Sequence, residues 1–265
     1  MRKTIIAAGL AMLALTGLGE PSTNRAPLRV ALTFDDGNKD HLLIAAGELE
    51  KRGWRGVFNL ITDKIGANEK CLTWEDVREL VRRGHEITTH TRTHPNLVKM
   101  MNEGKADEVR REIAESRDAI TKNAGVTPRY MCSPYVAQNE ATAKICREVG
   151  LTQMLSCRHN FGAGNEDQVK VVVERCIARG DQRLDLLHHG VSAEDHGGWR
   201  AFRNREAFAH HLDLVAELER EGKVIVTDYD GLIGDCALTA KAWPRHAVSE
   251  PAKDQKAACP RKDAK

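Results

Sequence analysis

Short apolar runs alternate with amphipathic segments along most of the chain. The runs predict buried strands, and the segments between them carry apolar residues three and four positions apart, as one face of a helix requires. The first such pair is the run 28–34 and the segment 40–52, in which Leu43, Ala46 and Leu49 share a face. The predicted strands are 28–34, 56–61, 85–89, 129–132, 151–156, 169–174, 184–188 and 224–227, and the predicted helices are 40–52, 73–83, 106–123, 139–149 and 205–220.

This alternation predicts an α/β fold. Strands that are separated by helices usually pair in parallel, with the helices outside the sheet. About seven such units favour a closed (β/α) barrel over an open sheet. In a parallel barrel the residues that follow each strand meet at one end, so we expect the chemistry of the protein at the strand ends.

The start of the chain has the pattern of a targeting segment. Arg2 and Lys3 precede an uncharged apolar run, 5–18, and small residues stand before Glu20. A positive start, a short apolar core and a small-residue cleavage site predict a secretory signal peptide over 1–19. The alternative is a membrane anchor, but roughly 14 apolar residues are fewer than the ~20 that span a bilayer. We therefore expect a secreted or periplasmic protein without a membrane span after cleavage.

The remaining chain divides into a barrel domain, 20–235, and a Pro-rich tail, 236–265, without apolar period, for which we expect loose order. Lysine and arginine total 40 against 38 acidic residues, so the net charge of +2 gives no support for a nucleic-acid binder. Seven cysteines without a CxxC pair argue against a cysteine zinc site and leave at least one thiol free. A bridge between Cys236 and Cys259 is one of several pairings open in an oxidising compartment.

Two adjacent carboxylates follow the first predicted strand, in the sequence Thr-Phe-Asp-Asp-Gly at 33–37. On an extended chain Asp35 and Asp36 point in opposite directions, so one can bind a metal while the other acts as a base. Gly37 permits the turn that this arrangement needs. By itself Asp-Asp-Gly indicates only an ordinary turn.

Two histidines follow the third predicted strand. His90 and His94 stand in a Thr-rich segment that ends in Pro95, so a strand end that runs into a turn is favoured over a helix. By itself such a pair can arise by chance. Together with a carboxylate of the first cluster, the two imidazoles form a candidate metal triad that leaves positions open for water and substrate.

Two weaker clusters follow later strands. The first is Cys-Ser-Pro-Tyr at 132–135, and the second holds His188 and His189, with Trp199 a few residues later. A histidine at a strand end can transfer a proton near neutral pH. Since two histidines are adjacent, we expect at least one of them to have a structural role.

Taken together, these motifs resemble the polysaccharide deacetylase family, the fourth carbohydrate esterase family. The segment 33–37 matches the first motif of that family, and 84–87 with 90–95 matches the second. Pro134 and Tyr135 match the end of the third motif, and Leu187 with the following histidines resembles the fifth. The likeness covers about residues 28 to 230, and its first two motifs are the specific ones.

The resemblance implies a distorted (β/α) barrel of about seven strands and a divalent metal, zinc or cobalt. It implies that Asp36, His90 and His94 bind this metal, and that Asp35 is the base that activates a metal-bound water. The backbone N–H of Tyr135 would stabilise the oxyanion. A histidine of the fifth motif would protonate the leaving group, and the Gly-Trp pair that ends at Trp199 favours His189 over His188.

Two departures from the family pattern bear on activity. Cys132 occupies the position at which the third motif has an arginine that orients the base, and residues 155–159 lack the Asp and Trp of the fourth motif. Arg158 and Arg175 are candidates to replace the missing arginine. Loss of such a supporting residue commonly costs about 10–100-fold in metal affinity or activity.

The leading hypothesis is a secreted metal-dependent hydrolase that removes N- or O-linked acetyl groups from a carbohydrate. One alternative is a catalytically weak glycan-binding protein that keeps the barrel, which the missing arginine favours and the intact metal triad opposes. The other is a hydrolase of different non-peptide C–N bonds. The expected partner is an acetylated glycan or sugar, bound near Pro134, Tyr135 and Trp199.

Overall fold

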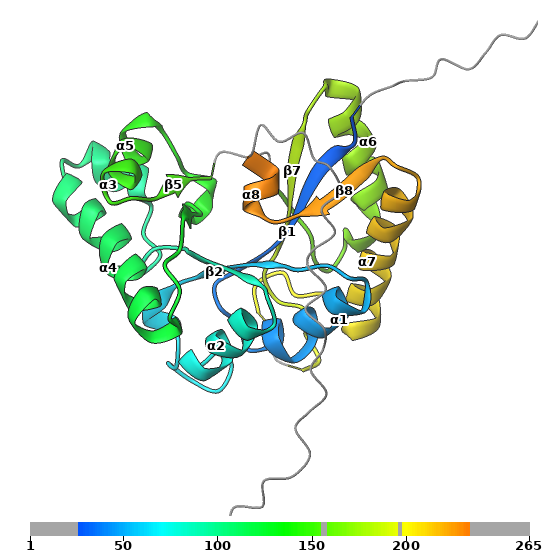
Figure 1. Cartoon of the computed structure of the whole chain (residues 1–265), viewed down its shortest axis with the longest axis horizontal. Helices are drawn as coiled ribbons and strands as arrows, with labels where there is room; N and C mark the ends of the chain where they lie inside the picture. Colours follow the sequence, from blue (N-terminus) through cyan, green and yellow to red (C-terminus); the bar gives the residue numbers. More distant parts are fainter. Residues whose placement is uncertain (1–25, 155–157, 196–197, 234–265) are drawn as a thin grey trace, which may run out of the picture.

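The computed structural model describes residues 26–154, 158–195 and 198–233, and a curled parallel sheet forms its centre (Figure 1). The strands run in the order β5-β4-β3-β2-β1-β7-β6, and β8 pairs with β1 beside this path. Helices cover the outside of the sheet, which confirms the distorted (β/α) barrel expected from the sequence. The strands are β1 (Leu28–Asp35), β2 (Val57–Leu60), β3 (Glu86–Thr89), β4 (Tyr130–Met131), β5 (Thr152–Gln153), β6 (Arg158–Asn160), β7 (Arg183–His188) and β8 (Val224–Thr227).

The helices alternate with these strands. The α-helices are α1 (Ala46–Lys51), α2 (Trp74–Arg82), α3 (Leu97–Asn102), α4 (Ala106–Ala124), α5 (Glu140–Glu148), α6 (Val169–Arg179), α7 (Arg205–Arg220) and α8 (Tyr229–Ile233). Short irregular turns of helix are η1 (His41–Ala45), η2 (Thr62–Lys64), η3 (Pro134–Val136) and η4 (Glu166–Gln168). At the start of α2, Thr73 and Asp76 form a capping box, which satisfies two backbone N–H groups.

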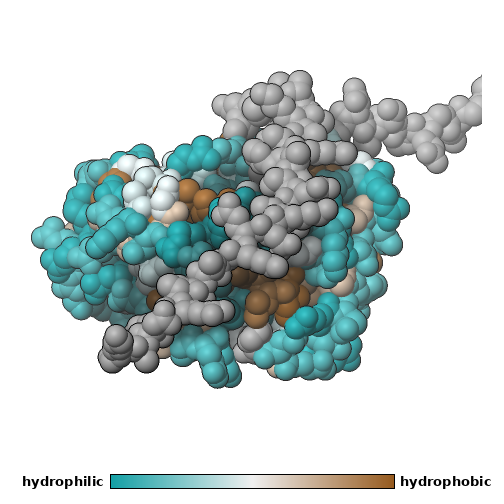
Figure 2. Space-filling view, turned by 60° about the horizontal axis from the view of Figure 1, so that its bottom comes forward, coloured by the Kyte–Doolittle hydropathy of each residue, from teal (hydrophilic) through white to brown (hydrophobic). Residues whose placement is uncertain are grey.

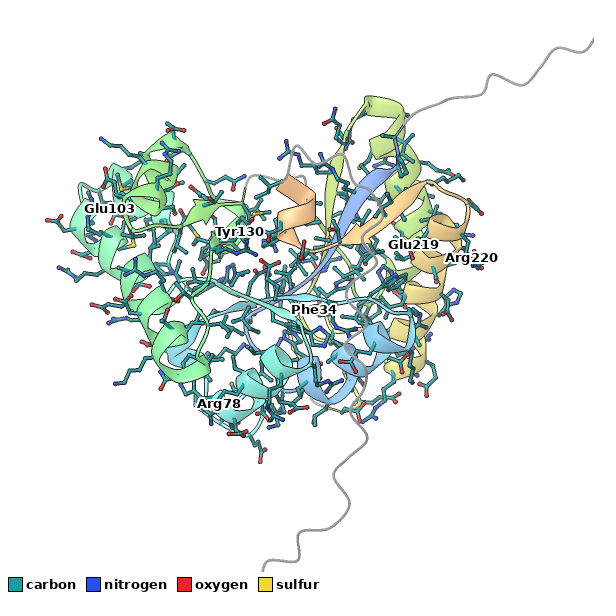
Figure 3. All side chains as sticks on the ribbon, viewed as in Figure 1. Phe34, Arg78, Glu103, Tyr130, Glu219 and Arg220 are labelled. Atoms are coloured by element: carbon teal, nitrogen blue, oxygen red, sulfur yellow. The ribbon has the colours of Figure 1, made fainter. Side chains whose placement is uncertain are left out.

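Strand β1 is the centre of the fold because it pairs along both edges. β7 pairs with it over Arg29–Phe34, while β8 and β2 pair with its first and last residues. Phe34 lies in the middle of the molecule, whereas Arg78 and Glu103 lie at its rim (Figure 3). The Phe34 ring stacks on Phe58 at 5.0 Å between ring centroids, and both belong to the largest core cluster.

The alternation of side chains along β1 separates two environments. Leu28, Val30, Leu32 and Phe34 face the core beneath the helices, whereas Ala31 belongs to a smaller cluster inside the curled sheet. Successive residues of a strand point to opposite faces, so Thr33 and Asp35 share the inner side with Ala31. This inner side carries the polar side chains described below.

One predicted strand is wrong. Residues 169–174 were expected to be extended because of their valines, but they begin helix α6. Val169, Val172, Val173 and Cys176 are buried, which is helical spacing, while Val171 is 54% exposed. A short polar strand, β6, which the sequence did not predict, lies just before this helix.

Several expectations fall outside the described residues, namely the signal peptide 1–19, the tail 236–265 and the pair Cys236–Cys259. Among the described cysteines, Cys71, Cys132 and Cys146 are buried free thiols, and the Cys176 side chain is also buried. Within the described ranges no helix has the length and apolar character needed to cross a membrane. Teal, hydrophilic residues dominate the coloured surface in Figure 2, with smaller brown patches between them.

Candidate functional site

The end of the central strand β1 places two carboxylates in different surroundings. Asp35 is the last residue of β1 and is 2% exposed. Asp36 follows in the left-handed region, with φ of 83°. This turn redirects the chain, so the Asp36 side chain stays partly accessible while the Asp35 side chain points into the curled sheet.

The two predicted histidines converge on Asp36. His90 follows β3 directly, and His94 lies four residues later at φ of 66°. The Nε2 atoms of the two rings are 3.1 Å apart, and each lies 4.0 Å from Asp36 Oδ1. The structure therefore brings the three residues of the predicted triad together, with ligand atoms within 4.8 Å of one another.

The protonation of these groups suits a divalent cation. His90 Nδ1 lies 2.8 Å from the carbonyl oxygen of Cys132, which can only accept, so Nδ1 carries the proton and Nε2 faces the site. Burial and the neighbouring His90 lower the pKa of His94 to about 4, so its ring is neutral at neutral pH. Asp36 Oδ1 is buried without a hydrogen-bond partner in the described structure. Two imidazoles and one carboxylate are ligands that zinc accepts.

A second group of possible ligands shares His90. Asp35, His90 and Cys132 are also close enough to hold a metal ion. However, Arg158 Nη2 lies 3.0 Å from both carboxylate oxygens of Asp35, and its positive charge opposes a cation at that place. The burial of Cys132 raises the pKa of its thiol well above the usual value, which disfavours the thiolate that a metal needs.

Asp35 is held as an ionised carboxylate. Asn59 Nδ2 donates to Asp35 Oδ1 at 2.6 Å, and Arg158 donates to both oxygens. Burial opposes the charge, but Arg158, His90 and His189 outweigh it and hold the pKa of Asp35 well below its usual range. Asp35 Oδ2 lies 3.6 Å from His90 Nε2, so a proton acceptor stands next to the candidate metal ligands.

The adjacent histidines His188 and His189 point to opposite sides of the sheet. In the register of β1 and β7, Phe34 pairs with His188, whose ring stacks on the Phe34 ring at 4.9 Å in the core beneath the helices. By strand alternation His189 points to the same inner side as Asp35. Its charge interactions with Asp35, Asp36 and His90 place it near the triad.

His188 has a structural environment. Its Nδ1 contacts the backbone oxygen of Thr33 at 3.1 Å, and its Nε2 lies 3.2 Å from His211 Nε2. The ring is fully buried, and its pKa is well below the usual value because burial and the neighbouring His211 disfavour the charged form.

The segment after β7 is tied to the loop after β1. His41 Nε2 donates to the backbone oxygen of His189 at 2.6 Å, and Asp40 Oδ2 accepts from the N–H groups of Val191 and Ser192 at 2.6 and 3.2 Å. These contacts fix the chain on both sides of Gly190. They hold the His189 backbone in place with buried side chains that the sequence analysis did not single out.

An exposed aromatic ring lies next to each of two site histidines. Tyr135, which is 64% exposed, stands 4.7 Å from the His94 ring between centroids, directly after Pro134. Trp199, which is 61% exposed, stands 4.4 Å from the His189 ring. The structure thus brings the expected substrate-binding residues to the border of the polar cluster.

Left-handed backbone conformations gather at this cluster. Asp36, His94 and Tyr135 have φ of 83°, 66° and 59°, values that residues other than glycine adopt rarely. Val136, which is β-branched, follows at 56°. Strain of this kind persists where the surrounding structure dictates the conformation, and it is commonly found at functional sites.

Two further buried polar residues near the site could have been recognised from the sequence, because each stands inside an apolar strand. Asn59 and Asp185 each interrupt an otherwise apolar strand, and both face the inside of the sheet. A polar residue in a strand that is buried on both faces needs a partner there. Of the two arginines considered from sequence, Arg158 reaches Asp35, whereas Arg175 is exposed on α6.

About half of the chain matches a known protein family. A family model described as polysaccharide deacetylase matches residues 23–154, which include the first two sequence motifs and Tyr135. The chain belongs to the polysaccharide deacetylase family. The resemblance seen in the sequence is thereby confirmed.

Individual relatives are distant. The chain is 27% identical over 173 residues to a bifunctional xylanase/deacetylase of Pseudobutyrivibrio xylanivorans, covering 65% of this chain and 27% of that protein. It is 33% identical over 107 residues to a peptidoglycan-N-acetylglucosamine deacetylase of Bacillus cereus, covering 40% and 36%. The chain therefore spans only about a third of the length of these relatives.

Solved structures share the fold. A family 4 acetyl xylan esterase from Clostridium thermocellum, solved in complex with a cobalt ion, superposes with a TM-score of 0.51. The two chains are 23% identical, and the match covers 77% of this chain and 89% of the other. At this identity the likeness supports the architecture alone.

Proposed function

We propose that this protein is a metal-dependent hydrolase that removes acetyl groups from a carbohydrate. The observation that carries the proposal is the convergence of two imidazole Nε2 atoms and an unpartnered carboxylate oxygen beside the ionised Asp35. Asp36, His90 and His94 would hold the metal. The donor set suits zinc, and the cobalt ion in the related esterase supports a site that accepts either metal.

When bound, a divalent cation lowers the pKa of a water molecule and polarises a carbonyl group. Asp35 takes the proton of the attacking water, because its carboxylate is ionised and adjacent to the ligands. Asn59 donates to its Oδ1 at 2.6 Å, and its Oδ2 lies on the side of His90. The Tyr135 N–H would donate to the oxyanion from a backbone that the left-handed turn at this residue positions.

His189 is the proposed proton donor to the leaving group. It faces the triad, and its backbone is fixed by His41. Burial lowers its pKa although Asp35 and Asp36 oppose this, and a weaker base makes its protonated form a stronger acid. An amine or alkoxide leaving from the tetrahedral intermediate needs such a proton.

The substrate is an acetylated glycan or sugar. The exposed rings of Tyr135, next to His94, and of Trp199, next to His189, offer flat apolar surfaces on which sugar rings can pack. The named activities of the relatives, on xylan and on peptidoglycan, support a polymeric substrate. The signal-like start of the chain supports a secreted or periplasmic enzyme.

The contact between Arg158 and Asp35 argues against the alternative of a catalytically weak binding protein. Although Cys132 replaces the family arginine, the proposed base still has a guanidinium partner. Acetate release decides between the two. The substrates are N-acetylated chitin oligomers, peptidoglycan and acetylxylan, each tested with metal-free protein and with added zinc or cobalt. Release from none of them under any metal condition would refute the proposed function.

The metal triad is tested by replacing His90 with alanine. The variant should lose stoichiometric zinc or cobalt, measured by elemental analysis, and acetate release with it. The matched control is His210→Ala, because His210 is an exposed histidine of α7 whose Nε2 lies 3.3 Å from the exposed carboxylate of Asp167. A His90→Ala variant that remains fully loaded would show that the ligands are misassigned.

A further inference from the structure

Arg158 is a buried cation that enters the site from an unexpected place. Arg158 is the first residue of β6, the edge strand next to β7. Cys132, which occupies the position of the family arginine, follows β4, near the opposite edge of the sheet. The Arg158 side chain is only 5% exposed. We propose that Arg158 is the positioning residue that fixes the proton-accepting carboxylate of Asp35, and that Asp185 in turn fixes Arg158. This inference rests on the proposed function, in which Asp35 is the base.

The contacts on Asp35 define its orientation. Arg158 Nη2 lies 3.0 Å from Oδ1 and 3.0 Å from Oδ2, and Asn59 holds Oδ1 at 2.6 Å. With Oδ1 bound by two donors, rotation of the carboxylate about its Cβ–Cγ bond is restricted, and Oδ2 is left facing His90. Arg158 is the sole cationic side chain that the structure shows in hydrogen-bond contact with Asp35 in the described ranges.

A second buried carboxylate holds the guanidinium from behind. Arg158 Nε lies 3.4 Å from Asp185 Oδ2, and the hydroxyl group of Tyr229 lies 3.5 Å from the same oxygen. Asp185 is fully buried and pairs with Arg158 in the register of β6 and β7. Two buried carboxylates that share one guanidinium constrain it from both sides, which a single pair would not do.

Cys132 cannot supply this function. Its sulfur lies 3.9 Å from Asp35 Oδ2, and burial keeps the thiol in its neutral form. A thiol is a weak donor without charge, whereas a guanidinium offers several donors in a rigid planar fork. The thiol and the guanidinium therefore stand near the same carboxylate, but only Arg158 can hold it by charge.

Removing the guanidinium should impair turnover rather than substrate binding. Displacement of a reacting group by about 1 Å can cost on the order of 10²-fold in rate. We therefore expect Arg158→Ala to lower kcat by about 10²-fold with little change in KM. Arg158→Lys should retain an intermediate kcat, because an ammonium group provides a point charge but not the planar fork.

The experiment measures kcat and KM for acetate release by the metal-loaded wild type, Arg158→Ala, Arg158→Lys and the control Arg175→Ala, which removes an exposed arginine of α6. Millimolar guanidinium chloride, far below denaturing concentrations, is then added to each. It should restore part of kcat in Arg158→Ala, and it should leave the wild type and Arg175→Ala unchanged. A merely structural role of Arg158 would not produce this rescue.

An unchanged kcat in Arg158→Ala would overturn the inference. If Arg158→Ala does not fold, full kcat in a folded Arg158→Lys would overturn it. A loss of kcat that guanidinium does not reverse, and that Arg158→Lys shows as well, would also overturn it. If the wild type releases no acetate, the proposed function fails separately. Urea unfolding of Arg158→Ala, Asp35→Ala and the double variant then decides on the contact. A double loss smaller than the sum of the single losses supports the pairing, and additive losses refute it.

Discussion

Replacing His188 and His189 by alanine, one at a time, should separate stability from turnover. The two histidines are neighbours in sequence, but His188 lies in the core while His189 faces the triad. We expect His188→Ala to destabilise the fold and to affect all substrates alike. We expect His189→Ala to leave the fold nearly intact and to impair amide substrates selectively.

The expected loss of stability follows from the surroundings of His188. Its ring is 0% exposed, stacks on Phe34 and contacts His211. Truncation of a buried aromatic side chain to alanine costs about 3–5 kcal/mol, and the smaller imidazole ring places this change near ~3 kcal/mol. For a domain of this size, that change lowers Tm by about 6–12 °C. The His189 ring borders the exposed Trp199, so its removal should cost about 1 kcal/mol.

The assay compares kcat/KM for one acetamide and one aryl acetate in each variant, beside thermal unfolding. The leaving group of an aryl acetate needs no proton, whereas an amine does, so His189→Ala should lower the amide rate by about 10²–10⁴-fold and the ester rate far less. Equal losses for both substrates in His189→Ala, together with a selective loss in His188→Ala, would show that the proton donor is the wrong histidine.

Two further predictions concern single carboxyl groups. Asp35→Asn should keep a full complement of metal by elemental analysis and lose about 10²–10⁴-fold in kcat, since an amide cannot accept the proton; an unchanged rate removes Asp35 from the mechanism. Burial and the nearby Asp228 and Asp230 raise the pKa of Glu86 to about 8. The unfolded chain releases this proton near the ordinary pKa of 4.5, whereas the folded protein keeps it until about pH 8. The free energy of unfolding therefore falls as pH rises from 4.5 to 8. In urea unfolding, the free energy of unfolding of Glu86→Gln should therefore equal that of the wild type at pH 4.5 and exceed it by up to about 3 kcal/mol at pH 7. A gain of the same size at both pH values would show that the pKa of Glu86 is not raised.

The apolar pattern predicted the strands that are longest and most buried. Runs at β1, β2, β7 and β8 are bounded by turns or polar residues, so their limits were visible. The segment 169–174 was wrongly predicted as a strand because valines are frequent in strands, although its buried positions have helical spacing. The strand β6 was missed since three polar residues carry no apolar signal, and its pairing with β7 is decided by tertiary contacts.

The site was predictable where residues adjacent in sequence act together. Asp35, Asp36, His90 and His94 stand in two short motifs, and the structure brings them together as expected. The supporting residues come from distant segments, as Arg158 shows, because only the fold brings its side chain from β6, across β7, to Asp35 at the end of β1. The orientation of His189 was implicit in the sequence, since its neighbour pairs with the core residue Phe34 by simple alternation.

The left-handed turns at the site also bear on attempts to make this protein more heat-stable. A screen that selects for thermal stability alone would favour glycine at Asp36 and His94, where φ of 83° and 66° strains any side chain, and each such gain would remove a metal ligand. Val136 differs, because it has φ of 56° and is 48% exposed, and it is not among the proposed ligands. Val136→Gly should relieve about 1 kcal/mol of backbone strain while all three ligands remain, so the loop can be stabilised at this position without the loss of a metal ligand.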